Sequence, residues 1–162
     1  MSENWMKPFL RDRRVAVLSI PRTDRAPLTT PVWYDYDGAR FLVQVESGSA
    51  KAKALAGKDD TAVALTIQSE VPPYRYVVIY GTASLQPNGQ PGLRRKLAHR
   101  YFGRLAGNMY VEQEEQRGVN DASLRVIEIL PQRTIAHDFH PEAGLFGRFY
   151  FAIYRWFRPV RA

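Results

Sequence analysis

Residues 29–53, TTPVWYDYDGARFLVQVESGSAKAK, decide how we interpret the rest of the chain. Residues 29–36 are rich in β-branched and aromatic side chains, which favours a strand. Asp37-Gly38 is a strong signal for a two-residue hairpin turn, and residues 41–45 then resume an apolar strand. The first half of the stretch therefore predicts a β-hairpin.

The second half of the stretch predicts a helix that starts directly after the hairpin. Ser49 is a good N-cap, residues 50–56 are almost all strong helix formers, and Gly57 is placed to end the helix. A capping hydroxyl, the exposed N–H groups of a first turn and the ammonium groups of Lys51 and Lys53 would together suit a phosphate. A solvated basic first turn would give the same pattern, so the residues alone leave both interpretations open.

Composition limits the classes of protein that the chain can belong to. Its 162 residues suit one domain, and the absence of cysteine excludes disulfides and thiolate metal sites, which fits a reducing cytoplasm. No signal peptide and no apolar run of about 20 residues is present, so we expect a soluble protein. The net charge of +7 indicates an anionic partner: a phosphorylated cofactor, a nucleic acid or an acidic membrane. Because the basic residues are dispersed among acids, we expect no nucleic acid.

The remaining pattern favours an antiparallel barrel, because strand signals follow one another mostly without helical crossovers. Gly81 is expected to mark a bulge in the longest strand. We expect strands at residues 15–20, 61–68, 74–85, 123–130 and 134–139, with a turn at 131–133. We expect a short helix at 5–14 and one long helix at 93–116. The predicted fold is mainly β: a six- to seven-stranded antiparallel barrel with one long helix and short N- and C-terminal helices.

We divide the chain into a barrel domain, residues 1–140, and a C-terminal helical extension, residues 141–162. Residues 145–158 put aromatic side chains on one helical face and arginines toward the other. Such a helix can pack on protein or lie on an anionic membrane, so peripheral membrane contact is one expectation. His137 and His140 resemble a metal pair, but in a strand they would point to opposite faces, and we predict no metal site.

Several segments, taken in order, carry a resemblance to a known family. These are Arg14-Val15-Ala16-Val17-Leu18, then Pro31-Val32-Trp33-Tyr34-Asp35-Tyr36-Asp37-Gly38, then Ser49-Ala50-Lys51-Ala52-Lys53-Ala54-Leu55, then Pro72-Pro73-Tyr74-Arg75-Tyr76 with Gly81-Thr82-Ala83. The set resembles the split-barrel flavin and deazaflavin oxidoreductases, the relatives of pyridoxamine 5'-phosphate oxidase, and is most similar to the branch that includes coenzyme F420-dependent reductases.

The resemblance implies a split β-barrel of the FMN-binding type, a homodimer, and a cofactor, F420 or FMN, in a groove between protomers. The ring would meet the residues that match Pro31, Val32 and Trp33. The strand at Val45, Glu46 and Ser47 would flank the ribityl chain, and Ser49, Lys51 and Lys53 would hold the phosphate end. The candidates for substrate contact are Tyr34, Tyr74, Arg75 and Tyr76.

The expected function is that of an oxidoreductase that transfers a hydride to an apolar or conjugated small molecule. Because the ring performs the redox chemistry, no catalytic residue is assigned. The alternative is a non-catalytic protein of the same fold that binds a flavin, a haem or other tetrapyrrole, or a lipid, with membrane association through the C-terminal helix.

Overall fold

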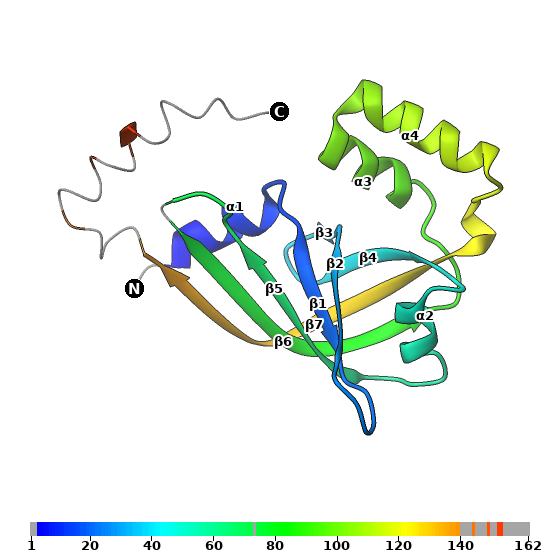
Figure 1. Cartoon of the computed structure of the whole chain (residues 1–162), viewed down its shortest axis with the longest axis horizontal. Coiled ribbons are helices and arrows are strands. Elements are labelled where there is room, and N and C mark those ends of the chain that lie inside the picture. The colour runs from blue at the N-terminus through cyan, green and yellow to red at the C-terminus, as the bar shows by residue number, and fades with distance from the viewer. Residues whose placement is uncertain (1–2, 73, 140–143, 145–148, 150–151, 154–162) are drawn as a thin grey trace.

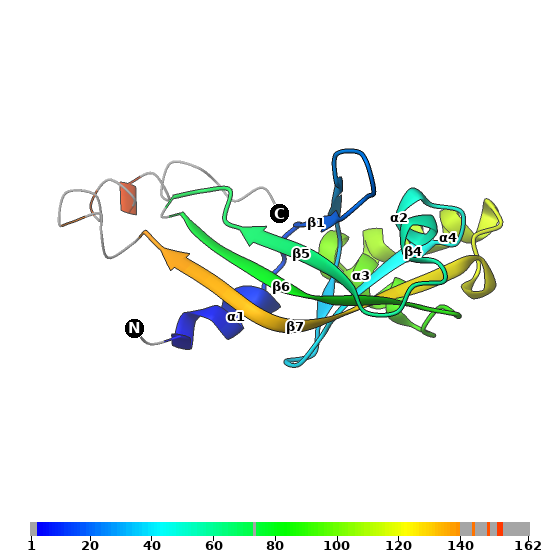
Figure 2. The ribbon, with the colours of Figure 1, turned by 90° about the horizontal axis from the view of Figure 1, so that it is seen from below.

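The computed structural model describes residues 3–72, 74–139, 144, 149 and 152–153, and all structural statements below concern these residues. Its helical elements are η1 (Glu3–Trp5), α1 (Met6–Arg11), α2 (Ala50–Leu55), α3 (Leu93–Phe102), α4 (Arg104–Gln116) and η2 (Asp121–Ser123). Its strands are β1 (Ala16–Ile20), β2 (Leu28–Val32), β3 (Asp35–Tyr36), β4 (Phe41–Glu46), β5 (Thr61–Gln68), β6 (Arg75–Gln86) and β7 (Leu124–Asp138). Figures 1 and 2 show one curved sheet with α1 at one end and the α3–α4 pair to one side.

The strands form one antiparallel sheet in the order β2-β1-β5-β6-β7-β4-β3. β2 and β3 are its two edges, yet only Trp33 and Tyr34 separate them along the chain. The sheet must therefore curl until its edges approach each other, because the three residue steps from Val32 to Asp35 span at most about 11 Å. This curled half-barrel confirms the predicted mainly β, antiparallel split barrel.

The interior of the curl is filled by alternate residues of each strand. β1 and β5 alternate buried and partly exposed positions, as expected for strands with one face on a core. The core includes Leu18, Leu65, Ile79 and Ile127, all essentially inaccessible. Phe9 and Leu10 of α1 join the same core, so the N-terminal helix covers one end of the barrel.

The predicted turn at 131–133 is wrong, because β7 runs unbroken across it. Gly81 of β6 lies opposite Pro131 and Tyr80 lies opposite Arg133, so Gln132 is the extra residue of a bulge. Proline is tolerated at such a bulge because it lacks an N–H to donate to the ladder. The bulge predicted at Gly81 is confirmed, and the long strand β6 provides a partner for β7 on both sides of it.

The predicted long helix is also wrong: α3 and α4 are two packed helices. They are separated by Gly103, whose φ of 82° is in the left-handed region that glycine adopts at low cost. At Gly107 the helices approach so closely that a Cβ would lie 2.8 Å from the Ala98 carbonyl carbon. The two glycines make a helical hairpin out of a sequence whose i,i+4 pattern resembles one continuous helix.

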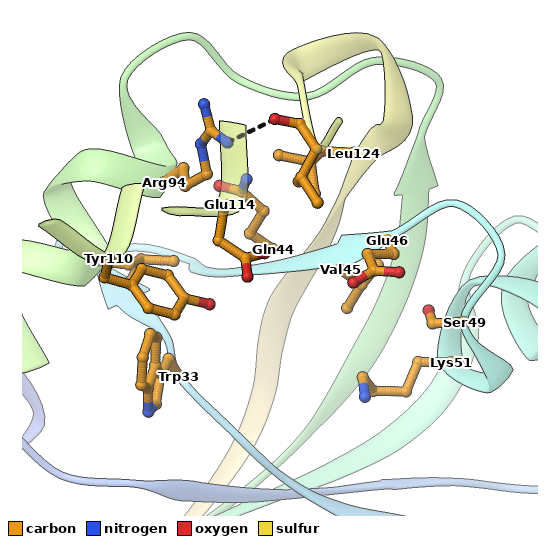
Figure 3. A pocket seen from close by; sticks show the side chains of 12 residues that line it. Trp33, Gln44, Val45, Glu46, Ser49, Lys51, Arg94, Tyr110, Glu114 and Leu124 are labelled. Carbon is orange, nitrogen blue, oxygen red and sulfur yellow. Dashed lines mark hydrogen bonds between the residues drawn. The ribbon is translucent and has the colours of Figure 1, made fainter. Parts of the chain in front are cut away.

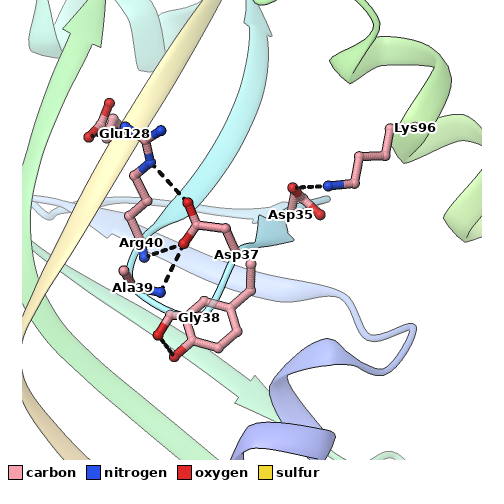
Figure 4. A network of polar contacts seen from close by, with 8 residues as sticks. Asp35, Asp37, Gly38, Ala39, Arg40, Lys96 and Glu128 are labelled. Carbon is pink, nitrogen blue, oxygen red and sulfur yellow. Dashed lines mark hydrogen bonds and ion pairs between the residues drawn. The ribbon is translucent and has the colours of Figure 1, made fainter.

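An ion-pair cluster ties α3 to the edge strand β3. The carboxylate of Asp35 is buried, and it contacts Lys96 Nζ at 2.6 Å (Figure 4). Arg100 Nη1 lies 3.6 Å from the same carboxylate. Leu93 and Leu97 of α3 pack with Leu42 in a second apolar cluster. The position of the helical hairpin is thus fixed by contacts with the first half of the chain.

The β3–β4 turn has four residues rather than the predicted two, since Tyr36 pairs with Phe41. Asp37 Oδ1 accepts hydrogen bonds from the backbone N–H groups of Ala39 at 2.8 Å and Arg40 at 2.9 Å (Figure 4). An aspartate that bonds the backbone ahead of it stabilises a turn by itself. The guanidinium of Arg40 then bridges Asp37 and Glu128 of β7.

We expect the replacement Asp37→Asn to lower stability at neutral pH and to matter less in acid. The N–H groups of Arg40 and Ala39 lower the pKa of Asp37 from its ordinary value. A lowered folded-state pKa gives stability that is present at neutral pH and lost as the pH falls below about 4. Because the carboxylate is exposed, the loss at pH 7 should be below about 1 kcal/mol. Urea unfolding at about pH 7 and about pH 3 checks this; an equal difference from wild type at both pH values contradicts it.

The predicted C-terminal helix at 145–158 lies outside the described residues, apart from Phe149, Ala152 and Ile153. The boundary at residue 140 therefore stays a prediction. Among the described residues, no helix has the length and apolar composition to cross a membrane.

Candidate functional site

A pocket of about 350 Å³ opens between β4, the start of α2 and the α3–α4 hairpin. Its volume lies at the lower end of the range for small-molecule sites, about 300–1,000 Å³. Its lining comes from both halves of the chain and consists of Trp33, Gln44, Val45, Glu46, Ser49, Lys51, Arg94, Leu97, Tyr110, Glu114, Val119 and Leu124.

The two ends of the pocket differ in chemistry. Figure 3 shows Trp33 and Tyr110 together on one side and Ser49 and Lys51 on the other. Ser49 caps α2 as predicted, since its Oγ accepts a hydrogen bond from the Ala52 N–H at 3.2 Å. The pocket therefore has an aromatic end and a cationic end.

The aromatic end is held rigid by ring contacts. Trp33 stacks on Tyr101, with ring centroids 4.9 Å apart and planes within 9°. Phe102 meets Trp33 edge-on at 4.9 Å, and Tyr110 lies against it at 5.7 Å. The hydroxyl of Tyr101 donates to the Arg14 carbonyl at 2.6 Å and accepts from the Tyr34 N–H at 3.2 Å. These contacts fix the indole in place, so a planar ligand would meet a prepared surface.

Hydrogen-bond acceptors lie between the two ends. Gln44, Glu46 and Glu114 line this part (Figure 3), and the Oε1 atom of Gln44 is buried without a partner among the described residues. Burial and the nearby carboxylates of Glu114 and Glu46 raise the pKa of Tyr110, so its hydroxyl stays a proton donor at neutral pH. An unpaired buried acceptor is costly, so the middle of the pocket favours a ligand that carries O–H or N–H donors.

The structure brings together five of the nine residues predicted to bind the cofactor: Trp33, Val45, Glu46, Ser49 and Lys51. The other four do not line the pocket. Val32 is buried in the core, and Pro31 is exposed on the edge strand β2. The backbone of Ser47 donates to the Ser123 carbonyl at 2.9 Å, and Lys53 is exposed on α2.

The four candidates for substrate contact lie elsewhere. Tyr34 is fully buried and its hydroxyl donates to the Leu10 carbonyl at 2.9 Å, so its aromatic ring is part of the core rather than of a binding surface. Tyr74, Arg75 and Tyr76 line a second hollow of about 530 Å³ with Phe139, at the far end of β6. Within one chain, they do not share the first pocket.

Sequence reasoning missed the side of the pocket that comes from the second half of the chain. Gln44 could have been predicted from Glu46, because side chains two residues apart in a strand lie on the same face. Tyr110 and Glu114 carried no such signal, since only the break at Gly103 turns α4 back toward β4. Arg94 lies on α3, whose position beside β3 and β4 depends on contacts with the first half of the chain. Arg94 has a structural role: its guanidinium donates to the Val119 carbonyl at 2.9 Å and pairs with Glu115 at 2.8 Å.

The curled antiparallel sheet, with a pocket between β4, α2 and a helical hairpin, defines a split-barrel protein. The family model described as pyridoxamine 5'-phosphate oxidase matches residues 3–127, well over half of the chain. The chain therefore belongs to the pyridoxamine 5'-phosphate oxidase family. A comparison with curated proteins finds no match.

Solved structures share the fold at low sequence identity. The conserved hypothetical protein Rv2991 from Mycobacterium tuberculosis is 20% identical with a TM-score of 0.66, and the alignment covers 88% of each chain. An F420 reductase is 17% identical with a TM-score of 0.54, covering 80% of this chain and 94% of its own. The FAD and haem binding protein from Mycobacterium smegmatis is 13% identical with a TM-score of 0.58, covering 85% and 71%.

Proposed function

We propose that the protein is an oxidoreductase that binds F420 or FMN in the pocket and transfers a hydride to an apolar or conjugated small molecule. The observation that carries the proposal is the pocket's polarity. An aromatic surface at Trp33 and Tyr110 faces a cationic end at Ser49 and Lys51, which matches a flavin-type molecule with a ring at one end and a phosphate at the other. The family and its F420 reductase member support the same cofactor class.

The residues of the pocket fit such a cofactor. The unpartnered Oε1 of Gln44 lies where a polyol chain would pass and would accept one of its hydroxyls. Lys51 and the first turn of α2 would hold the phosphate, because an ammonium and unpaired N–H groups both favour an anion. When bound, the ring supplies the hydride chemistry. The protein contributes orientation, a charged anchor and a surface that limits access of water to the ring.

We propose further that the protein acts as a homodimer. The outer face of β6 and β7 carries apolar side chains that a single chain leaves exposed: Tyr80, Leu130 and Ile135. The sheet register places Ile135 opposite Val78 and Leu130 opposite Thr82, on the same outer face as Tyr80. An exposed apolar sheet face favours association. Tyr74, Arg75 and Tyr76 would reach a substrate only where a second protomer brings its hollow to the pocket.

Titration of the purified protein with FMN and with F420, followed by cofactor fluorescence, tests the proposal. We expect saturable binding of at least one, and light scattering should give the mass of a dimer. Binding of neither would sink the oxidoreductase proposal. Saturable binding without turnover of any reducible acceptor would favour the alternative, a non-catalytic binder.

The structure favours a flavin or a lipid over haem for that alternative. None of the 12 residues that line the pocket is a histidine, cysteine or methionine, the common axial ligands of haem iron. Tyr110 is the one tyrosine in the lining, and its raised pKa opposes the deprotonation that an iron-bound phenolate requires.

A further inference from the structure

The corner between α3 and α4 exposes three large apolar side chains. Phe102 is 46% exposed, Leu105 79% and Met109 63%. Leu105 and Met109 are four residues apart, so they share one face of α4, and Phe102 directly precedes the break at Gly103. Neighbouring exposed apolar residues mark an interaction surface, whereas single ones need no explanation. We call Phe102, Leu105 and Met109 the hairpin tip.

Basic side chains surround the hairpin tip. Arg13 Nη1 donates to the Tyr101 carbonyl at 3.2 Å, which holds that guanidinium beside Phe102. Arg104 is exposed and adjoins Leu105 in sequence, and Arg95 reaches Asn108 at 3.5 Å, next to Met109. Residues 93–111 contain no aspartate or glutamate. Arg94, Lys96 and Arg100 form ion pairs with Glu115 and Asp35, so the cations that can meet an anionic partner at the hairpin tip are Arg13, Arg95 and Arg104.

The exposed apolar side chains and the arginines at this corner indicate the kind of partner that it binds. The α3–α4 hairpin stands to one side of the sheet (Figure 1). An exposed apolar corner with arginines beside it suits a lipid interface, where apolar side chains enter the boundary of headgroups and acyl chains and arginines meet anionic headgroups. We infer that the hairpin tip docks the protein on an anionic lipid surface.

Docking there would orient the pocket toward the lipid. The ring centroid of Phe102 lies 4.9 Å from that of Trp33 and 5.3 Å from that of Tyr110, and both of these residues line the pocket's aromatic end. An apolar molecule dissolved in the bilayer would then reach the aromatic end without crossing water. This consequence rests on the proposed function, but the docking itself does not, because lipid binding is measured without cofactor or turnover.

Co-sedimentation of the full chain with vesicles tests the inference. We expect binding to vesicles of phosphatidylcholine mixed with phosphatidylglycerol, weaker binding to phosphatidylcholine alone, and loss of binding in high salt. Leu105→Asp and Met109→Asp should each lower the partition coefficient by about tenfold or more, since each removes an inserted side chain and adds a repelled charge. Both positions are largely exposed, so the variants should fold, which circular dichroism verifies.

Val71→Asp is the matched control. Val71 is 45% exposed in the β5–β6 connection, which Figure 1 shows away from the α3–α4 hairpin, so the same charge change there should leave vesicle binding unaltered. Absence of vesicle binding, equal binding to both vesicle types, or unchanged binding of both tip variants overturns the inference; the last result would place the contact elsewhere, such as residues 145–158. It is also overturned if Leu105→Asp converts a dimer to a monomer in light scattering, because the tip would then be an interface between copies of the chain.

Discussion

Replacement of Gly81 by alanine is expected to lower the free energy of unfolding by about 1–3 kcal/mol, the range for a forced clash in a packed interior. Gly81 is buried in β6 at the bulge, directly opposite Pro131. A Cβ built at this position overlaps the carbonyl oxygen of Leu130 and lies 3.0 Å from its carbonyl carbon. Because those atoms are backbone, relief requires that β6 and β7 separate, and this pair holds the middle of the sheet.

Gly48→Ala is the control for that variant. Gly48 lies in the connection between β4 and α2, and a Cβ there meets no atom within 4 Å. The same added methyl group should therefore change stability by less than about 0.5 kcal/mol, as is usual for surface substitutions. Urea unfolding followed by tryptophan fluorescence measures both variants. A Gly81→Ala protein as stable as Gly48→Ala would show that the two strands do not approach as closely as described.

Lys51→Ala is expected to weaken cofactor binding by about 1.5–3 kcal/mol, through loss of a charge-assisted hydrogen bond to the phosphate. This free energy corresponds to an increase in Kd of roughly 10- to 150-fold. Lys51 lines the cationic end of the pocket, and its side chain is only partly exposed. Fluorescence titration with whichever cofactor binds the wild type measures the change.

Lys53→Ala is the control that distinguishes a direct contact of Lys51 with the phosphate from a general effect of losing one positive charge on α2. Lys53 lies two residues further along the same short helix, is exposed and does not line the pocket. Both variants lose one positive charge from α2 and gain the same helix-forming residue. We expect the Kd of Lys53→Ala for the cofactor to stay within about twofold of the wild-type value, since an exposed charge outside the pocket lining is screened by ions in the solvent. Equal losses from the two variants would remove Lys51 from a specific phosphate contact.

The part of the pocket that comes from the first half of the chain could be predicted, because these residues lie close together in the sequence and form recognisable local patterns. The N-cap at Ser49 follows from residue types within one helical turn, and it is confirmed by the hydrogen bond to Ala52. Trp33, Val45 and Lys51 were grouped by resemblance, and the structure places them in one lining. Lys53 was grouped with them but faces elsewhere, because a helix turns about 100° per residue and only one side of so short a helix can face the pocket.

The structure of the second half of the chain could not be predicted, because it depends on contacts with residues that are far away in the sequence. The segment Pro131-Gln132-Arg133 has the composition of a turn, but β6 offers a ladder on both sides of it, and pairing outweighs local preference. Tyr110 and Glu114 reach the pocket only because Gly103 and Gly107 fold α4 back against α3. No pattern within one helix reports that fold-back.

The sequence by itself determined that this chain is a mainly β antiparallel barrel with a helix start at Ser49, because strand alternation and capping act over a few residues. The resemblance to the family implied that the barrel is a split one. Only the tertiary structure decided that residues 29–53 supply part of a pocket rather than all of it. The strand order puts β2 and β3 at opposite edges of the sheet, the curl brings these edges together, and the helical hairpin adds Arg94, Tyr110 and Glu114. Those placements follow from contacts between residues far apart in the chain.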